Sequence, residues 1–128
     1  MSLANSEVAV LLPVEDVDRA KKFYTELLGL KYTATNGEGA AMFELGGGTP
    51  LLLLPRPGGT RSDSTALTWN VDDLEAEIKE LENRGVVFED YDVPGLKTVD
   101  HIATVGEDKA AWFNDPDGNV LCLHTGPS

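Results

Sequence analysis

Apolar residues first appear in this sequence as a short run and then return at helical spacing. The run from Val8 to Val14 is typical of a buried strand. Asp16 follows as a helix cap, and the helical spacing continues as far as Gly29, a residue that favours a helix end. The pattern therefore predicts a strand and then an amphipathic helix whose apolar positions are Val17, Ala20, Tyr24, Leu27 and Leu28.

Three short strand-like runs follow this helix. They cover Leu30–Thr35, Ala40–Leu45 and Pro50–Leu54. The segments NGEG and GGGT separate them, and their glycines can adopt the positive φ angles that tight turns need. The first part of the chain is thus predicted to fold as β-α-β-β-β.

The same pattern starts again after a segment rich in proline, glycine and small polar residues. This segment, at about 56–64, is typical of a linker. Thr65–Val71 then predicts a strand, and Asp73–Arg84 predicts a helix that Gly85 closes. The strands expected after it are Val86–Tyr91, Lys109–Asn114 and Asn119–His124, and the intervening stretch Asp92–Asp108 predicts a long, flexible loop at the rim.

Residue-level similarity between the two halves indicates a tandem repeat. Ala40-Ala41-Met42-Phe43 resembles Ala110-Ala111-Trp112-Phe113, and the two stretches lie 70 residues apart. The strand-to-helix entries also match, because Val14-x-Asp16-Val17 resembles Val71-x-Asp73-Leu74. A lone unit of about 60 residues buries little surface. We therefore expect one domain, 4–128, in which a module at about 7–55 packs with a module at about 65–125.

Composition narrows the classes of partner. The chain has 10 basic and 22 acidic residues, a formal charge of −12, which disfavours binding to nucleic acid and to anionic membranes. This charge solvates the surface and can also attract cationic ligands. No run approaches the roughly 20 apolar residues of a membrane helix. The single cysteine fits a reducing compartment, so we expect a cytoplasmic protein.

Three stretches resemble the vicinal oxygen chelate superfamily of glyoxalases, bleomycin resistance proteins and extradiol dioxygenases. They are VEDVDRAKKFYTELLGLKY at Val14–Tyr32, WNVDDLEAEIKELENRG at Trp69–Gly85 and WFNDPDGNVLCL at Trp112–Leu123. The resemblance implies an α+β fold in which two tandem β-α-β-β-β modules form curled mixed sheets around a cavity, with the helices outside. It also implies a homodimer. In metal-dependent relatives, the first and last strands of each module provide histidine, glutamate or glutamine ligands.

The positions equivalent to those ligands do not carry metal-binding side chains here. Alignment on the two entry motifs and on DPDG places Ala9, Leu52, Ala66 and Cys122 at them. We therefore expect neither the family metal nor another cofactor. Cys122 and His124 provide two donors at most, so an unrelated zinc site would need His101 or a carboxylate as well.

The segment DPDGNVLCLH is compatible with three structural or chemical interpretations. Asp115-x-Asp117 with Asn119 resembles the start of a calcium loop, but the required glycine and late glutamate are replaced by Val120 and Gly126. A nucleophilic Cys122 paired with His124 is disfavoured, because residues two apart on a strand are about 6.5–7 Å apart. We expect a hairpin turn, followed by Cys122 as a small apolar wall residue and His124 as a polar group at the cavity mouth.

Strand alternation predicts which side chains share the cavity wall with Cys122. His124 and Val120 would lie on its face, and the repeat transfers this face to the first module. The resemblance adds Trp112, with Met42 as its repeat partner, although an ordinary core tryptophan remains an alternative. Trp69 and Tyr24 are expected in the core. The predicted ligand contacts are Leu11, Met42, Leu52, Leu54, Thr68, Trp112, Cys122 and His124.

Three functions are compatible with this apolar, aromatic wall. The first is metal-free sequestration of a small organic ligand, cationic or aromatic, as the resemblance to bleomycin resistance proteins implies. The second is a lyase, isomerase or dioxygenase-like enzyme that uses general acid-base chemistry, with His124 as the candidate. His101, Glu44 and Asp108 are further candidates for that chemistry. The third is an accessory module whose cavity is vestigial.

Overall fold

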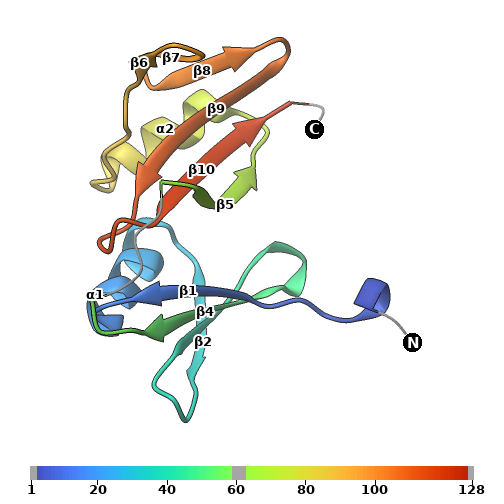
Figure 1. Ribbon diagram of the computed structural model, residues 1–128, viewed down its shortest axis with the longest axis vertical. Coiled ribbons are helices and arrows are strands. Elements are labelled where there is room, and N and C mark those ends of the chain that lie inside the picture. Colours follow the sequence, from blue (N-terminus) through green and yellow to red (C-terminus); the bar gives the residue numbers. More distant parts are fainter. Residues whose placement is uncertain (1–2, 59–62, 127–128) are drawn as a thin grey trace. The chain divides into compact units, whose positions relative to one another are not determined.

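The computed structural model describes residues 3–58 and 63–126. The chain forms two compact units, unit 1 at Met1–Arg61 and unit 2 at Ser62–Ser128 (Figure 1). Their boundary falls inside the predicted linker 56–64, of which residues 59–62 lie outside the described part. In the described ranges, no helix is long and apolar enough to cross a bilayer.

Unit 1 is a four-stranded mixed sheet with one helical segment. Strand β1 (Val10–Val14) leads into α1 (Val17–Lys22), and β2 (Lys31–Thr35), β3 (Ala41–Glu44) and β4 (Pro50–Pro55) follow. The strand order is β1-β4-β3-β2, with β1 and β4 parallel and the other neighbours antiparallel. The predicted β-α-β-β-β order is confirmed for this unit.

The helical segment of unit 1 begins and ends where the sequence indicates. The carboxylate of Asp16 accepts a hydrogen bond from the Arg19 N–H at 3.1 Å and so caps α1. Beyond α1 the helix widens into a π-helical turn, Phe23–Leu27, in which the Thr25 hydroxyl donates to the Lys21 carbonyl at 2.8 Å. Such back-bonding competes with the regular α-helical ladder. Gly29, at φ 72°, ends the segment.

Alternation along the strands of unit 1 places one face of the sheet in the core. Phe43 on β3 and Tyr24 on the helical segment are fully buried, with ring centroids 6.1 Å apart. The residues between the core positions lie on the opposite face, where Leu11 is 52% exposed. The buried residues of the sheet are Leu12, Val14, Ala41, Phe43, Leu51 and Leu53.

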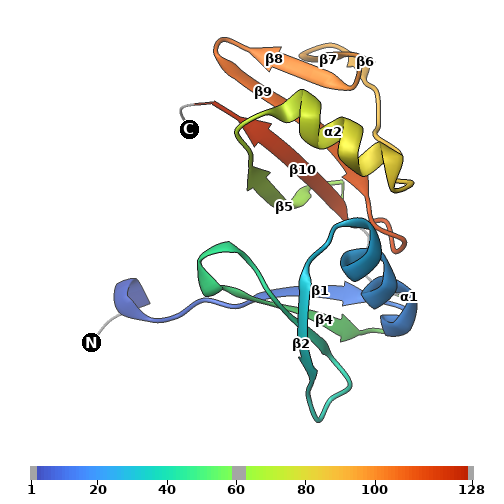
Figure 2. The ribbon, with the colours of Figure 1, turned by 180° about the vertical axis from the view of Figure 1, so that it is seen from behind.

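Unit 2 repeats this plan and extends it at one edge. Strand β5 (Thr65–Asn70) leads into α2 (Leu74–Asn83), and the hairpin of β9 (Asp108–Asn114) and β10 (Val120–Thr125) closes the unit. The strand order is β5-β10-β9-β8-β7-β6, and β5 pairs with β10 in parallel. β5-β10-β9 therefore corresponds to β1-β4-β3 of unit 1. Figure 2 shows α2 alongside this sheet.

Two predictions for the edge of the unit 2 sheet were wrong. Val86–Tyr91 is not a strand, because Phe88 alone makes a bridge, to Phe113. Asp92–Asp108 is not a long loop, because it forms β6 (Asp92–Val93), β7 (Leu96–Val99) and β8 (Ile102–Val105) before β9 begins. These strands have only two to four residues, too few for an alternating pattern to be recognised.

The core of unit 2 lies between α2 and the sheet. The apolar stripe predicted on the helix is confirmed, because Leu74, Ile78 and Leu81 are all buried. The Trp69 ring stacks on buried Phe113, with centroids 6.4 Å apart and planes at 16°. Trp69 thus lies on the core side of the sheet, as predicted, although it is only half-buried.

The DPDG segment forms the predicted turn between β9 and β10. Asp115 is only 5% exposed, and its Oδ1 accepts hydrogen bonds from the Asp117 and Asn119 N–H groups, both at 2.9 Å. Its Oδ2 accepts from the Asn119 side-chain amide at 2.8 Å. Gly118 has φ 85°, which glycine tolerates best. The Asp115 carboxylate therefore organises this turn by local hydrogen bonds.

Candidate functional site

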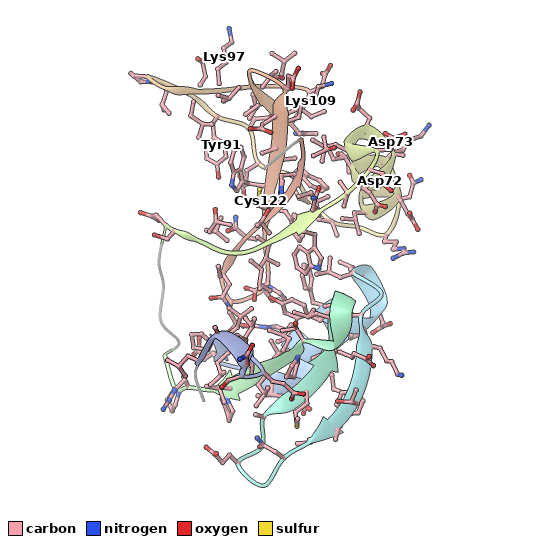
Figure 3. The ribbon with its side chains drawn as sticks, turned by 90° about the vertical axis from the view of Figure 1, so that its right-hand side faces the viewer. Asp72, Asp73, Tyr91, Lys97, Lys109 and Cys122 are labelled. Carbon is pink, nitrogen blue, oxygen red and sulfur yellow. The ribbon has the colours of Figure 1, made fainter. Side chains whose placement is uncertain are left out.

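The sheet of unit 2 has one face against α2 and an opposite face that carries predicted ligand contacts. Cys122 on β10 pairs with Thr68 on β5 and with Trp112 on β9, so these three residues form one row across the sheet. His124 lies two residues further along β10, on the same face. Figure 3 shows Tyr91 and α2 on opposite sides of the sheet that contains Cys122. We call this surface the tryptophan face; its residues are Thr65, Thr68, Tyr91, Trp112, Cys122 and His124.

Trp112 is held from two directions on the tryptophan face. Its indole Nε1–H donates a hydrogen bond to the Thr65 hydroxyl at 3.2 Å. The Tyr91 ring meets it edge to face, with centroids 5.7 Å apart and planes at 86°. Both aromatic side chains are half-buried. They form a corner with an exposed part, which is suited to contact with another ring.

The phenol of Tyr91 is in an environment that disfavours its ionisation. Burial is the main reason that its pKa is raised above the ordinary value of 10.0, and the negative charges of Glu89 and Asp63 add to the effect. The phenol therefore keeps its proton and can donate a hydrogen bond at neutral pH.

Cys122 lies beneath this surface and is poorly suited to act as a nucleophile. The residue is 5% exposed, and burial raises the pKa of its thiol above the ordinary value of 9.0, against a smaller opposing effect from hydrogen bonding to Thr68. The Sγ atom lies 3.4 Å from the Leu123 carbonyl, to which it donates. A thiol that resists ionisation is a weak nucleophile and a weak metal ligand.

His124 is oriented by a threonine. Its Nδ1 lies 2.7 Å from the Thr68 hydroxyl, and either atom can donate in this hydrogen bond. Because Nδ1 is used in this way, Nε2 is the imidazole atom that remains to meet a ligand. Two of the predicted ligand contacts, Thr68 and His124, therefore form one ordered polar pair.

The predicted contacts of unit 1 lie together on the face of its own sheet that is opposite the core. Leu52 on β4 pairs with Leu11 on β1 and with Met42 on β3, which gives a second row of three. Leu54 follows two residues later on the same face. Met42, Leu52 and Leu54 are half-buried. Unit 1 therefore presents an apolar row where unit 2 presents an aromatic and polar one.

The residues predicted to correspond to the metal ligands of metal-dependent relatives have few donor atoms. Ala9 and Leu52 of unit 1, and Ala66 of unit 2, have no donor atom in their side chains. Cys122 has one, but its raised pKa opposes the thiolate form that metals bind. In residues 3–58 and 63–126, no group of three or more His, Cys, Asp or Glu side chains is arranged to hold a metal ion.

The other candidate acid-base groups lie in separate surroundings. His101 sits at the turn between β7 and β8, where its Nε2 is 3.3 Å from Glu82 of α2 and its Nδ1 is 2.9 Å from Asp90. Glu44 of unit 1 forms an ion pair with Lys31 at 3.4 Å. His101 is therefore engaged by Glu82 and Asp90, and Glu44 is engaged within unit 1.

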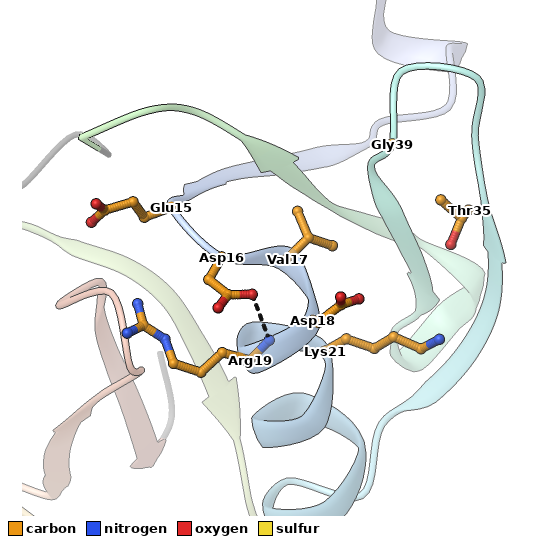
Figure 4. Close-up of a pocket in the computed structure, with 8 residues that line it drawn as sticks. All are labelled: Glu15, Asp16, Val17, Asp18, Arg19, Lys21, Thr35 and Gly39. Carbon is orange, nitrogen blue, oxygen red and sulfur yellow. Dashed lines mark hydrogen bonds between the residues drawn. The ribbon is translucent and has the colours of Figure 1, made fainter.

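Two recesses in the described surface do not contain the predicted ligand contacts. One, of about 580 Å³, surrounds the start of α1 and is lined by Glu15, Asp16, Asp18, Arg19 and Lys21 together with Val17, Thr35 and Gly39 (Figure 4). The other, of about 470 Å³, lies between α2 and the β7–β8 turn, beside Ile78 and His101. Charged side chains make up much of the lining of both recesses.

Sequence reasoning missed Tyr91 and Thr65 as members of this surface. Tyr91 comes from the edge segment whose pairing was predicted wrongly. Thr65 sits next to an irregularity, because Thr65 and Leu67 pair with the consecutive residues Val120 and Leu121. Ala66 is therefore an extra residue in β5, and simple alternation does not predict the direction of side chains across such a bulge.

Solved structures resemble the chain over nearly its whole length. The antibiotic-binding protein TnmS3 from Streptomyces sp. CB03234 is 28% identical, with a TM-score of 0.68 over 98% of this chain and 100% of that chain. A glyoxalase/bleomycin resistance protein from the same strain is 30% identical, with a TM-score of 0.64 over 92% and 98%. The fosfomycin resistance protein FosX from Listeria monocytogenes is 13% identical, with a TM-score of 0.71 over 96% and 94%, and shows the fold alone. No curated protein matches the chain.

The predicted family and fold class are confirmed. The mixed sheets with few helices match those of these neighbours, and the model of the Glyoxalase/Bleomycin resistance protein/Dioxygenase superfamily matches residues 8–123. The chain therefore belongs to the glyoxalase/bleomycin resistance protein/dioxygenase superfamily.

Proposed function

We propose that the tryptophan face binds a small, flat organic molecule and sequesters it without the metal of the family's metal-dependent members. The observation that carries this proposal is the corner formed by Tyr91 and Trp112, whose planes stand at 86°. One ring of such a corner can stack on a ligand while the other contacts its edge. Ala66 and Cys122 stand at positions where we expect the family's metal ligands. Their side chains are small, so an organic ligand would have room at this corner.

The charge near the corner favours a cationic ligand. Glu89 and Asp63 are among the causes of the raised pKa of Tyr91, so their negative charge reaches the phenol. A cation over an aromatic ring gains from the ring quadrupole, and carboxylates at the rim add to that attraction. The formal charge of −12 would also increase the local concentration of cationic ligands.

The hydrogen-bonded pair of Thr68 and His124 provides a polar contact next to the apolar wall. Binding sites for small molecules usually combine an apolar lining with a few oriented polar groups. His124 Nε2 would meet a donor or acceptor of the ligand, while Thr68 holds Nδ1. The antibiotic-binding neighbour, at 28% identity, supports the same class of function.

The proposal also includes predictions from the sequence about unit 1, domain organisation, assembly and location. Leu11, Met42, Leu52 and Leu54 of unit 1 are proposed as further ligand contacts. A single domain spanning 4–128, a homodimer and a cytoplasmic location also remain proposals.

A ligand screen with two tryptophan variants tests the proposal. Cationic antibiotics and aromatic metabolites would be screened by thermal shift, since a ligand that binds the folded state raises the melting temperature. Each hit would then be titrated by tryptophan fluorescence. We expect quenching in the native protein and in Trp69→Phe, which retains Trp112, and loss of quenching in Trp112→Phe.

The two variants form a matched pair, because Trp69 and Trp112 are the two tryptophans of the chain. Calorimetry on Trp112→Phe separates loss of the signal from loss of binding. Quenching that persists in Trp112→Phe and disappears in Trp69→Phe would contradict the proposed location. A screen without any hit would favour an accessory module.

Metal analysis tests the metal-free part of the proposal. Purified protein is expected to contain far less than one equivalent of nickel, zinc, iron or manganese per chain. If the protein bound metal stoichiometrically and the metal gave it glyoxalase or dioxygenase activity, the metal-free part of the proposal would be overturned.

The hydrogen bond between Thr68 and His124 favours a second candidate, an enzyme that works by general acid-base catalysis. A histidine whose Nδ1 is held can exchange a proton through Nε2. This candidate predicts that His124→Ala abolishes turnover of a bound compound while its affinity changes little. His101→Ala is the control, because the chain has two histidines and His101 lies at the β7–β8 turn. Unchanged turnover in His124→Ala would exclude His124 from catalysis.

A further inference from the structure

Tyr91 lies where the chain, after pairing with β9 through Phe88 and Glu89, bends towards β6. Just before the bend, the Glu89 N–H donates to the Trp112 carbonyl at 2.8 Å. Just after it, β6 begins at Asp92. A residue at such a bend needs contacts of its own if its ring is to keep one orientation. The geometry of the Tyr91–Trp112 corner therefore depends on what holds Tyr91.

Thr98 of β7 holds both backbone groups of Tyr91. The Tyr91 N–H donates to the Thr98 hydroxyl at 2.8 Å, and the Thr98 N–H donates to the Tyr91 carbonyl at 2.8 Å. The same hydroxyl donates to Oδ1 of Asp90 at 3.0 Å. A hydroxyl can accept and donate at once, so the side chain of Thr98 links Tyr91 to the preceding carboxylate.

Asp90 is fixed in turn by the β7–β8 turn. Its Oδ1 also accepts from the His101 N–H at 3.0 Å. Its Oδ2 lies 2.9 Å from His101 Nδ1, although that nitrogen does not have the geometry of a hydrogen bond. Asp100 and His101 have φ 51° and 74°, the combination required by a two-residue type I′ hairpin turn. The turn thus presents the His101 N–H to Asp90.

We propose that Thr98 is a positioning residue, whose hydroxyl fixes the Tyr91 backbone so that the phenol ring stands at right angles to Trp112. Thr98 would not touch the ligand; it would act by keeping the corner formed before the ligand arrives. Preorganisation of this kind improves affinity because less freedom is lost on binding. The consequence for affinity rests on the proposed function, whereas the positioning itself belongs to the free protein.

The first experiment uses the free protein and needs no ligand. In a Trp69→Phe background, Trp112 is the reporter, and its accessibility is measured by acrylamide quenching. Thr98→Val keeps the shape of the side chain but removes the hydroxyl, so quenching should rise towards the level of Tyr91→Ala. Thr98→Ser keeps the hydroxyl and should restore the native value. Thr104→Val is the matched control, because Thr104 is an exposed threonine on the neighbouring strand β8.

A double variant separates positioning from a general structural role. If Thr98 acts through Tyr91, then Thr98→Val has no further effect on Trp112 quenching when Tyr91→Ala is already present. Additive effects of the two changes would overturn the proposal. If Thr98→Val does not fold stably, Asp90→Ala takes its place, because it removes the acceptor of the Thr98 hydroxyl; unchanged Trp112 quenching in Asp90→Ala would then overturn the proposal.

The second experiment measures affinity with ethidium, a flat aromatic cation, as the probe. Thr98→Val should weaken binding by about 2- to 10-fold, as expected for the loss of one hydrogen bond, while Thr98→Ser and Thr104→Val bind like the native protein. If Thr98→Val binds ethidium with native affinity although its Trp112 quenching has increased, the proposed effect of Thr98 on binding would be overturned. Failure of ethidium to bind the native protein would count against the proposed function, and the quenching result would still decide the positioning of Tyr91.

Discussion

Tyr91 and Trp112 meet edge to face, with ring centroids 5.7 Å apart, although they come from different parts of the unit 2 sheet. Trp112 belongs to β9, whereas Tyr91 lies at the bend that precedes β6. The contact exists because the Glu89 N–H pairs with the Trp112 carbonyl and Thr98 then holds Tyr91. Backbone hydrogen bonds at the sheet edge thus create the aromatic corner of the candidate site.

The raised pKa of Tyr91 predicts how a nearby charge acts on this corner. Glu89→Gln removes one of the negative charges that raise this pKa, so the pKa should fall towards the ordinary value of 10.0. The measurement is an alkaline titration of tyrosinate absorbance, with Tyr91→Phe to identify the residue. Glu75→Gln, on α2, is the control and should leave the titration unchanged. A Tyr91 titration that is insensitive to Glu89→Gln would show that the Glu89 charge does not contribute to the raised pKa.

The buried Cys122 thiol predicts a pH-dependent loss of stability. Because its pKa is raised from 9.0, the folded state keeps the thiol proton to higher pH than the unfolded chain. Its contribution to the free energy of unfolding is therefore intact below pH 9.0 and declines as pH rises through the folded-state pKa. Urea unfolding across this range should show a shallower alkaline decline in Cys122→Ala than in the native protein. Equal slopes would exclude the thiol as a cause.

The Asp115 carboxylate predicts a large effect from one polar change in the β9–β10 turn. Asp115→Ala would leave the Asp117 and Asn119 N–H groups without their acceptor and should lower the free energy of unfolding by about 3 kcal/mol. Asp115→Asn keeps one carbonyl oxygen for these donors and should cost less. Chemical denaturation measures both variants. Equal losses in the two would mean that charge, and not the acceptor, is decisive.

The cap of α2 predicts a difference between two adjacent aspartates. The Asp73 carboxylate accepts from the Ala76 N–H at 3.1 Å, whereas Asp72 precedes the cap (Figure 3). Asp73→Ala should lower the free energy of unfolding by about 1 kcal/mol, and Asp72→Ala by less than about 0.5 kcal/mol. Thermal and urea unfolding of the pair measure this. Similar losses would show that the local negative charge, not the hydrogen bond, stabilises the helix.

Local features of the sequence were sufficient to predict most of the fold. Asp16 and Asp73 cap the two helices because each carboxylate can reach an N–H three residues later. Gly29 ends the first helical segment at a positive φ. The DPDG turn is equally local, since its hydrogen bonds span four residues at most. Such features depend on neighbours in the sequence and so can be recognised without a structure.

The edge of the unit 2 sheet could not be predicted in this way. Strands β6, β7 and β8 are too short to show a period, and the β7–β8 turn uses Asp100 and His101 instead of the glycine that usually marks a tight turn. These strands are held by successive pairing, of β8 with β9, β7 with β8 and β6 with β7, and by the hydrogen bond from Thr98 to Asp90. Consequently Tyr91, which depends on this edge, was absent from the predicted ligand contacts.

The sequence by itself determined the β-α-β-β-β plan of unit 1, its repetition in β5, α2, β9 and β10, both helix caps and the DPDG turn, because these follow from local chemistry and side-chain alternation. It also led to the prediction that Ala9, Leu52, Ala66 and Cys122 occupy the positions of the family's metal ligands. Only the tertiary structure decided that Tyr91 stands against Trp112 and that Thr68 orients His124. These contacts join residues 21 and 56 positions apart, and pairing between distant strands brings them together.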